Sequence, residues 1–81
     1  MELSISIPAG ILALSGKTAA EFAQDARFLL ASKMFELGRL SSGRAAELCG
    51  MNRADFLQSL GSVGVSMIQT DLDDLRAELA R

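Results

Sequence analysis

The amino-acid sequence predicts a mainly α-helical fold with a small β element, in the order strand, long helix, helix-turn-helix, short strand and C-terminal helix. Three observations predict it. Apolar residues alternate with serine at the N-terminus, apolar residues follow helical spacing after Thr18, and two short helical segments flank Gly50. With 81 residues, the chain has room for a single domain over residues 1–81.

The predicted first strand covers residues 2–7. Leu3, Ile5 and Ile7 alternate with serines, and this period of two is typical of a strand with one buried face. A proline and a glycine follow and end the strand. Because a single strand is not stable alone, it needs a second one, either residues 65–69 of this chain or the same segment of another copy. Both pairings stay open at this point.

The longest predicted element is a helix that runs from Thr18 to about Leu37. Thr18 and Glu21 have the spacing of a capping box, and Gly38 stands where a left-handed residue ends a helix. Two apolar stripes lie on opposite faces of this helix. The first contains Phe22, Ala26, Leu29, Leu30, Met34 and Leu37, and the second contains Phe28, Ala31 and Phe35. The helix is therefore covered on both sides within the monomer, or by a second subunit on one side.

The composition favours the burial of extra apolar surface in a homodimer or against a partner. Apolar residues make up 49% of the chain, and a chain of this length buries little surface in a core of its own. The predicted dimer interface consists of apolar residues from the strand and from the second stripe, namely Leu3, Ile5, Ile7, Phe28 and Phe35.

Residues 41–62 predict a helix-turn-helix. Ser41 or Ser42 is expected to cap its first helix, and Asn52 its second. Gly50 supplies the turn between them, because glycine tolerates a positive φ. Ala46 is small enough for the second helix to cross close to the first.

This helix-turn-helix is the strongest functional signal in the sequence. The second helix is expected to point Asn52, Arg53, Ala54, Leu57 and Gln58 outward. Arginine can pair with guanine, and asparagine or glutamine with adenine, while other arginines hold phosphates. The predicted DNA-binding residues are Arg39, Arg44, Asn52, Arg53 and Gln58. The alternative is a protein-interaction module in which the two helices only pack and bind no DNA.

The C-terminal residues 65–81 predict a short strand and an amphipathic helix. Leu72, Leu75 and Leu79 form a narrow apolar edge, with arginines nearby. Such a helix either lies in a groove of a partner protein or docks on its own domain. The predicted partner-binding residues are Leu72, Leu75, Arg76, Leu79 and Arg81.

The composition argues against several classes of protein. The chain has no histidine and one cysteine, so we expect no catalytic residue, no metal site, no cofactor and no enzymatic activity. The net charge of −2 means that any DNA contact must come from a local cluster of basic residues. The chain has neither a membrane-length apolar stretch nor a signal peptide, and its cysteine is unpaired, so we expect a cytoplasmic protein without a membrane contact.

Residues 38–48, which read Gly-Arg-Leu-Ser-Ser-Gly-Arg-Ala-Ala-Glu-Leu, carry the most specific resemblance, together with Phe56 and Leu57. They resemble a small prokaryotic family of VapB-like helix-turn-helix antitoxins, long catalogued as uncharacterised. The resemblance extends from about Leu3 to Leu79, nearly the whole chain.

The resemblance implies the antitoxin of a type II toxin–antitoxin pair. Its partner would be a PIN-domain ribonuclease toxin, which the antitoxin binds and blocks, and its dimer would bind operator DNA and repress its own promoter. It also implies that the C-terminal stretch binds the toxin, with Arg76 or Arg81 at the acidic, metal-binding centre of the nuclease. A stand-alone helix-turn-helix transcriptional regulator is the alternative.

Overall fold

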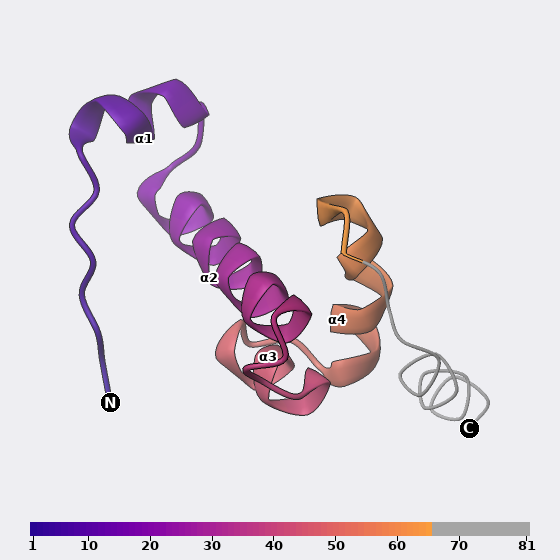
Figure 1. Ribbon diagram of the computed structural model, residues 1–81. Coiled ribbons are helices and arrows are strands. Elements are labelled where there is room, and N and C mark those ends of the chain that lie inside the picture. Colours follow the sequence, from indigo (N-terminus) through magenta and orange to yellow (C-terminus); the bar gives the residue numbers. More distant parts are fainter. Residues whose placement is uncertain (66–81) are drawn as a thin grey trace.

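The computed structural model describes residues 1–65, and these fold into helices joined by short loops (Figure 1). The elements are α1 (Ala9–Ser15), α2 (Ala19–Glu36), α3 (Ser42–Leu48), α4 (Arg53–Ser59) and the 3₁₀ helix η1 (Leu60–Val63). Figure 1 shows α2 as the longest helix, with α3 and α4 packed together at one side of it.

The predicted β element is wrong for the described residues, none of which forms a strand. Residues 1–8 lie outside any helix or strand, and no backbone hydrogen bond joins residues 1–7 to the rest of residues 1–65. A strand is defined by its ladder of hydrogen bonds, so the alternating pattern alone does not make one. Val65 follows η1 and is buried, and the other residues of the predicted second strand, 66–69, lie outside the described part.

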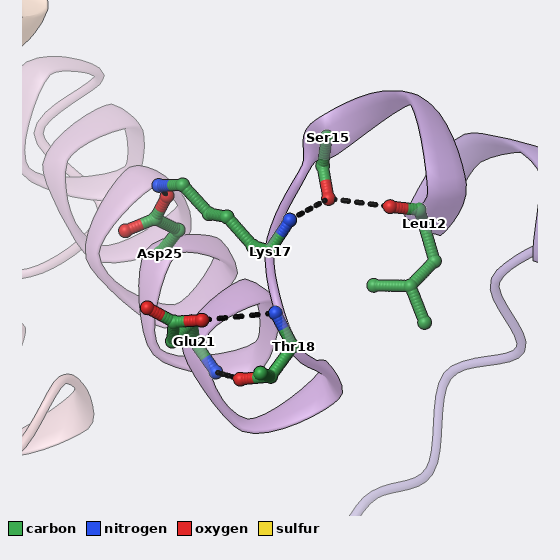
Figure 2. Close-up of polar contacts among 6 residues, drawn as sticks. All are labelled: Leu12, Ser15, Lys17, Thr18, Glu21 and Asp25. Carbon is green, nitrogen blue, oxygen red and sulfur yellow. Dashed lines mark hydrogen bonds and ion pairs between the residues drawn. The ribbon is translucent and has the colours of Figure 1, made fainter.

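The capping box at the start of α2 is confirmed (Figure 2). The Thr18 hydroxyl oxygen accepts a hydrogen bond from the Glu21 N–H at 3.2 Å, and the Glu21 carboxylate accepts one from the Thr18 N–H at 2.9 Å. Just before it, the Ser15 hydroxyl donates to the Leu12 carbonyl and accepts from the Lys17 N–H, which fixes the link between α1 and α2. The side-chain ammonium of Lys17 also pairs with the Asp25 carboxylate.

The end of α2 is confirmed as well. Gly38 has a φ of 75°, as predicted for the left-handed position after a helix. The Gly38 N–H donates to the Phe35 carbonyl and the Arg39 N–H to the Met34 carbonyl at 2.9 Å, which is the hydrogen-bond pattern of a Schellman motif. The chain thereby turns sharply from α2 into α3.

The core lies between α2 and the α3–α4 pair. Phe56 of α4 is fully buried, and the rings of Phe28 and Phe35 from α2 pack against it edge-to-face at centroid distances of 6.0 and 5.9 Å. Phe28 and Phe35, which the sequence assigned to a dimer interface, are partly buried here against the chain's own core. The monomer therefore covers the second apolar stripe of α2, which contains Phe28, Ala31 and Phe35.

The first stripe of α2 is left open. Leu29, Leu30 and Leu37 are about half exposed, on the side of the helix away from the core. Phe22, Ala26 and Leu30, together with apolar residues of the N-terminal segment, line a groove of about 380 Å³. Figure 1 shows the N-terminal segment and α4 on opposite sides of α2. The interpretation that the monomer itself covers both faces of α2 therefore does not hold for residues 1–65.

Candidate nucleic-acid interface

The predicted helix-turn-helix is present as α3, a four-residue turn and α4. Each helix begins with the cap that the sequence predicts. The Ser41 hydroxyl accepts from the Arg44 N–H at 3.2 Å, and the Asn52 side-chain oxygen accepts from the Asp55 N–H at 2.8 Å. Of the two serines considered for the first cap, Ser41 is the one that caps α3. The two short helices thus have well-defined first turns.

The turn between the helices depends on Gly50, whose φ is 70°. The Gly50 N–H donates to the Glu47 carbonyl at 3.2 Å, and the Met51 N–H donates to the Ala46 carbonyl at 3.0 Å. These bonds satisfy the carbonyls of Ala46 and Glu47 near the end of α3 and turn the chain toward α4. The Gln24 side-chain amide donates to the Cys49 carbonyl at 2.8 Å and so fastens the turn to α2.

Small residues bring the elements together at α3. Ala45 and Ala46 are buried, and they belong to the same core cluster as Phe56, Leu57 and Leu60 of the following helices. The prediction that a small residue is needed at position 46 agrees with this packing. Cys49 is buried beside them, and burial raises the pKa of its thiol, which donates to the Ala46 carbonyl at 3.5 Å.

Arg39 and Arg44, the two residues predicted to hold phosphates, are both exposed. Arg39 lies in the loop between α2 and α3, and Arg44 lies on α3. The Arg44 guanidinium pairs with the Glu47 carboxylate one turn later at 3.0 Å. Both side chains of this pair are well exposed, so the pair contributes little stability and leaves the guanidinium within reach of a ligand.

Asn52, the N-cap residue of α4, and Gln58, within α4, are both exposed and lie three positions either side of Asp55. Asn52 serves as a cap, since its side-chain oxygen is bonded to the Asp55 N–H and its NH₂ donates to the Asp55 carboxylate at 2.9 Å. Asp55 was missed in the sequence analysis, although its position three residues after an asparagine cap is the signal that predicts it. Gln58 is an exposed residue of α4.

Arg53 has a different place from the predicted one. It is half-buried at the first position of α4, and its Nε donates to the hydroxyl of Ser42, the first residue of α3, at 2.7 Å. Ser42 is itself buried. The guanidinium therefore joins the start of α4 to the start of α3. This is a positioning role that the sequence pattern did not indicate.

The outward orientation of Leu57 and Ala54 is also corrected. Leu57 is 0% exposed and belongs to the core, and Ala54 packs against that core. Phe56, Leu57 and Leu60 are all buried in the core cluster. The buried apolar face of α4 is therefore wider than expected, because it includes Leu57, which was predicted to point outward. The exposed surface of α4 is consequently polar and narrow.

The remaining predicted site residues fall in two groups. Leu3, Ile5 and Ile7 line the groove beside α2. The partner-binding residues, Leu72, Leu75, Arg76, Leu79 and Arg81, lie outside the described residues. Within residues 1–65, no group of three histidine, cysteine, aspartate or glutamate side chains is placed to hold a metal ion. No helix of this part is both long enough and apolar enough to cross a membrane.

The fold and the α3–α4 site define a small helical protein with a helix-turn-helix. A family model matches residues 1–81, and the chain belongs to this family, described as Uncharacterised protein family (UPF0175). Neither the curated proteins nor the solved structures contain a significant match to the chain.

Proposed function

We propose that this chain is the antitoxin of a type II toxin–antitoxin pair. In this proposal a homodimer binds operator DNA through α3 and α4, and residues 65–81 bind and block a PIN-domain ribonuclease. The observation that supports DNA binding is the α3–α4 unit itself, with its Gly50 turn and the exposed side chains of Arg39, Arg44 and Gln58 on or beside it.

The charges of this unit define how it would bind. Arg39 and Arg44 are exposed, and so are Glu47 and Asp55, so the surface has no large excess of positive charge. Nonspecific attraction to DNA is then weak, and specific contacts carry more of the affinity. In this interpretation Arg39 and Arg44 contact phosphates, and the Gln58 amide contacts a base edge. Arg53 acts on the DNA contact indirectly, by positioning α4.

The test is binding of the purified full chain to the DNA upstream of its own gene, measured by fluorescence anisotropy over a range of salt concentrations. Arg44→Ala should weaken binding to all sequences and lower the slope of log K against log salt by about 1. Gln58→Ala should reduce the discrimination between this DNA and random DNA, by about 1–3 kcal/mol.

Lys17→Ala is the matched control. Lys17, like Arg44, is an exposed cation paired with one exposed carboxylate, but it lies between α1 and α2 rather than on the helix-turn-helix. It should change neither the affinity nor the salt slope. If the wild-type chain binds this DNA no better than random DNA, the DNA-binding part of the proposal is wrong and the interaction-module alternative is favoured.

The toxin part of the proposal rests on the resemblance of residues 38–48 and of Phe56 and Leu57 to the VapB-like antitoxins. It is tested by isolating the chain at its native level from its own cells and identifying the proteins that accompany it by mass spectrometry. A PIN-domain ribonuclease in near-equal amount is expected. Leu75→Ala and Arg76→Ala should then weaken the complex without changing DNA binding, whereas a chain recovered with no protein partner would contradict the antitoxin assignment.

A further inference from the structure

Residues 1–8 form an N-terminal arm whose exposed apolar side chains are not accounted for by the packing of residues 1–65. Its apolar residues Leu3, Ile5 and Ile7 line the groove beside α2, yet they remain 77%, 69% and 44% exposed. Residues 1–7 form no backbone hydrogen bond within the part of the chain that the structure describes. A segment with an exposed apolar side, and with no backbone partner among residues 1–65, offers an edge that another strand can complete.

We infer that the arm pairs antiparallel with the arm of a second copy of this chain, around a two-fold axis at Ile5, and that the resulting two-stranded ribbon covers the apolar grooves of both α2 helices. This inference concerns the homodimer of the proposed function and specifies its interface.

The sequence of the arm fits such self-pairing. Residues 3–7 read Leu-Ser-Ile-Ser-Ile, a pattern of apolar and polar residues that is the same in both directions. In a two-fold interface, each residue meets its counterpart from the same patch. With Ile5 opposite the partner's Ile5, Leu3 lies opposite the partner's Ile7 and Ser4 opposite the partner's Ser6. All the apolar residues then fall on the face of the ribbon that meets α2, and the serines fall on the other face.

The charge distribution favours a second copy over a charged partner. Residues 3–16 include no charged residue, so nothing in this stretch repels an identical segment or attracts a nucleic acid or an acidic or basic protein. Among the residues that line the groove, only Arg27 carries a charge.

The available surface also suits a dimer. A stable interface buries about 800 Å² on each partner, which is about one seventh of the 5849 Å² accessible surface of the chain. The arm and the open stripe of α2 contribute apolar surface toward this area, from Leu3, Ile5, Ile7, Phe22, Ala26 and Leu30. A cover of this kind would remove apolar surface that a monomer leaves in water.

The first test measures the mass of the full chain in solution by light scattering, with no DNA and no other protein present. The wild-type chain should have twice its mass of 8.6 kDa. Ile5→Asp should reduce the mass to that of one chain, because two carboxylates would face each other at the axis. Leu14→Asp is the matched control. It puts the same charge on an 88% exposed leucine of α1 that does not line the groove, and it should stay dimeric.

A second test fixes the register without disrupting the interface. Ile5→Cys should form a disulfide-linked dimer under mild oxidation, since the two Cβ atoms at position 5 would lie within bonding reach. Ser4→Cys should cross-link at least about tenfold less, because position 4 faces position 6 of the partner subunit. The native Cys49 is buried and should not compete.

The outcomes separate this inference from the proposed function. A monomeric wild type, a dimer that persists in Ile5→Asp, or equal cross-linking of Ile5→Cys and Ser4→Cys would each overturn the inference. The first would fit an arm that pairs within its own chain, the second an interface elsewhere, and the third a parallel ribbon. Because no DNA or toxin enters either measurement, a failure of the antitoxin proposal would leave these results unchanged.

Discussion

The Nε of Arg53 donates to the hydroxyl of Ser42 at 2.7 Å and joins the first residue of α4 to the first residue of α3. The sequence pattern assigned Arg53 to base recognition, and the structure gives its Nε a partner inside the protein. A helix-turn-helix needs both the exposed residues that contact DNA and the internal contacts that hold the second helix at a fixed angle. Arg53 belongs to the second group through this bond.

Ser42→Ala should therefore destabilise the protein by about 1–3 kcal/mol, because it removes the buried hydroxyl that accepts the hydrogen bond from the Arg53 guanidinium. Urea unfolding followed by circular dichroism measures this loss. Ser62→Ala, which removes an exposed serine hydroxyl, should change the stability by less than about 0.5 kcal/mol. A double-mutant cycle with Arg53→Ala isolates the pair, and a coupling free energy near zero would contradict the positioning role.

Gly50→Ala should cost about 1–2 kcal/mol of stability. Its φ of 70° is left-handed, and an alanine is strained there even though no atom lies within 4 Å of the added Cβ. Gly43→Ala is the matched control in α3, where the space is equally open and the φ is not positive, and it should stabilise the protein by about 0.5–1 kcal/mol. Thermal unfolding of the two variants tests this difference, and equal effects would exclude backbone strain as the cause.

Local signals predicted most of the helix boundaries. The caps Thr18, Ser41 and Asn52 and the left-handed glycines at 38 and 50 each depend on a few neighbouring residues, and the structure has all of them in place. Such features are fixed by hydrogen bonds within one turn of chain, so the sequence contains the whole of the relevant interaction.

Features that depend on distant residues were predicted poorly. The alternation of residues 2–7 indicates a strand, but a strand exists only with a partner, and residues 1–65 provide none. Both stripes of α2 are apolar, so only the structure reveals that Phe28 and Phe35 meet Phe56 while the opposite stripe stays open. The seven-residue α4 is too short for its periodicity to distinguish a buried Leu57 from an exposed one.

Glu21 should make the stability of the protein depend on pH. Hydrogen bonds from the Thr18 backbone, then from the Thr18 side chain, lower the pKa of the Glu21 carboxyl below its usual value, and nearby Lys17 adds to this effect. A lowered pKa in the folded state gives stability that is present above the unfolded-state pKa and is lost as the pH falls through the folded-state pKa. Glu21→Gln keeps an oxygen acceptor for the capping box without the charge. The wild type should therefore melt above Glu21→Gln at pH 7, and the two melting temperatures should converge once the pH falls below the folded-state pKa of Glu21. A difference that stays constant down to pH 3 would contradict this role of the charge.

Cys49 should react slowly with thiol reagents in the folded protein. It is 1% exposed, and burial raises the pKa of its thiol, so at pH 8 both access and the thiolate fraction are low. Its reaction with a chromogenic disulfide should be about 100-fold slower in native buffer than in urea, because it must wait for local or global opening of the core. The matched control is Gln58→Cys in a Cys49→Ala background, which places a single thiol on the exposed side of α4 and should react at nearly the same rate in both conditions. A native Cys49 that reacts as fast as this exposed thiol would mean that the turn between α3 and α4 opens readily, and the core contacts of Ala46 and Phe56 would then be too weak to hold a helix-turn-helix in one geometry.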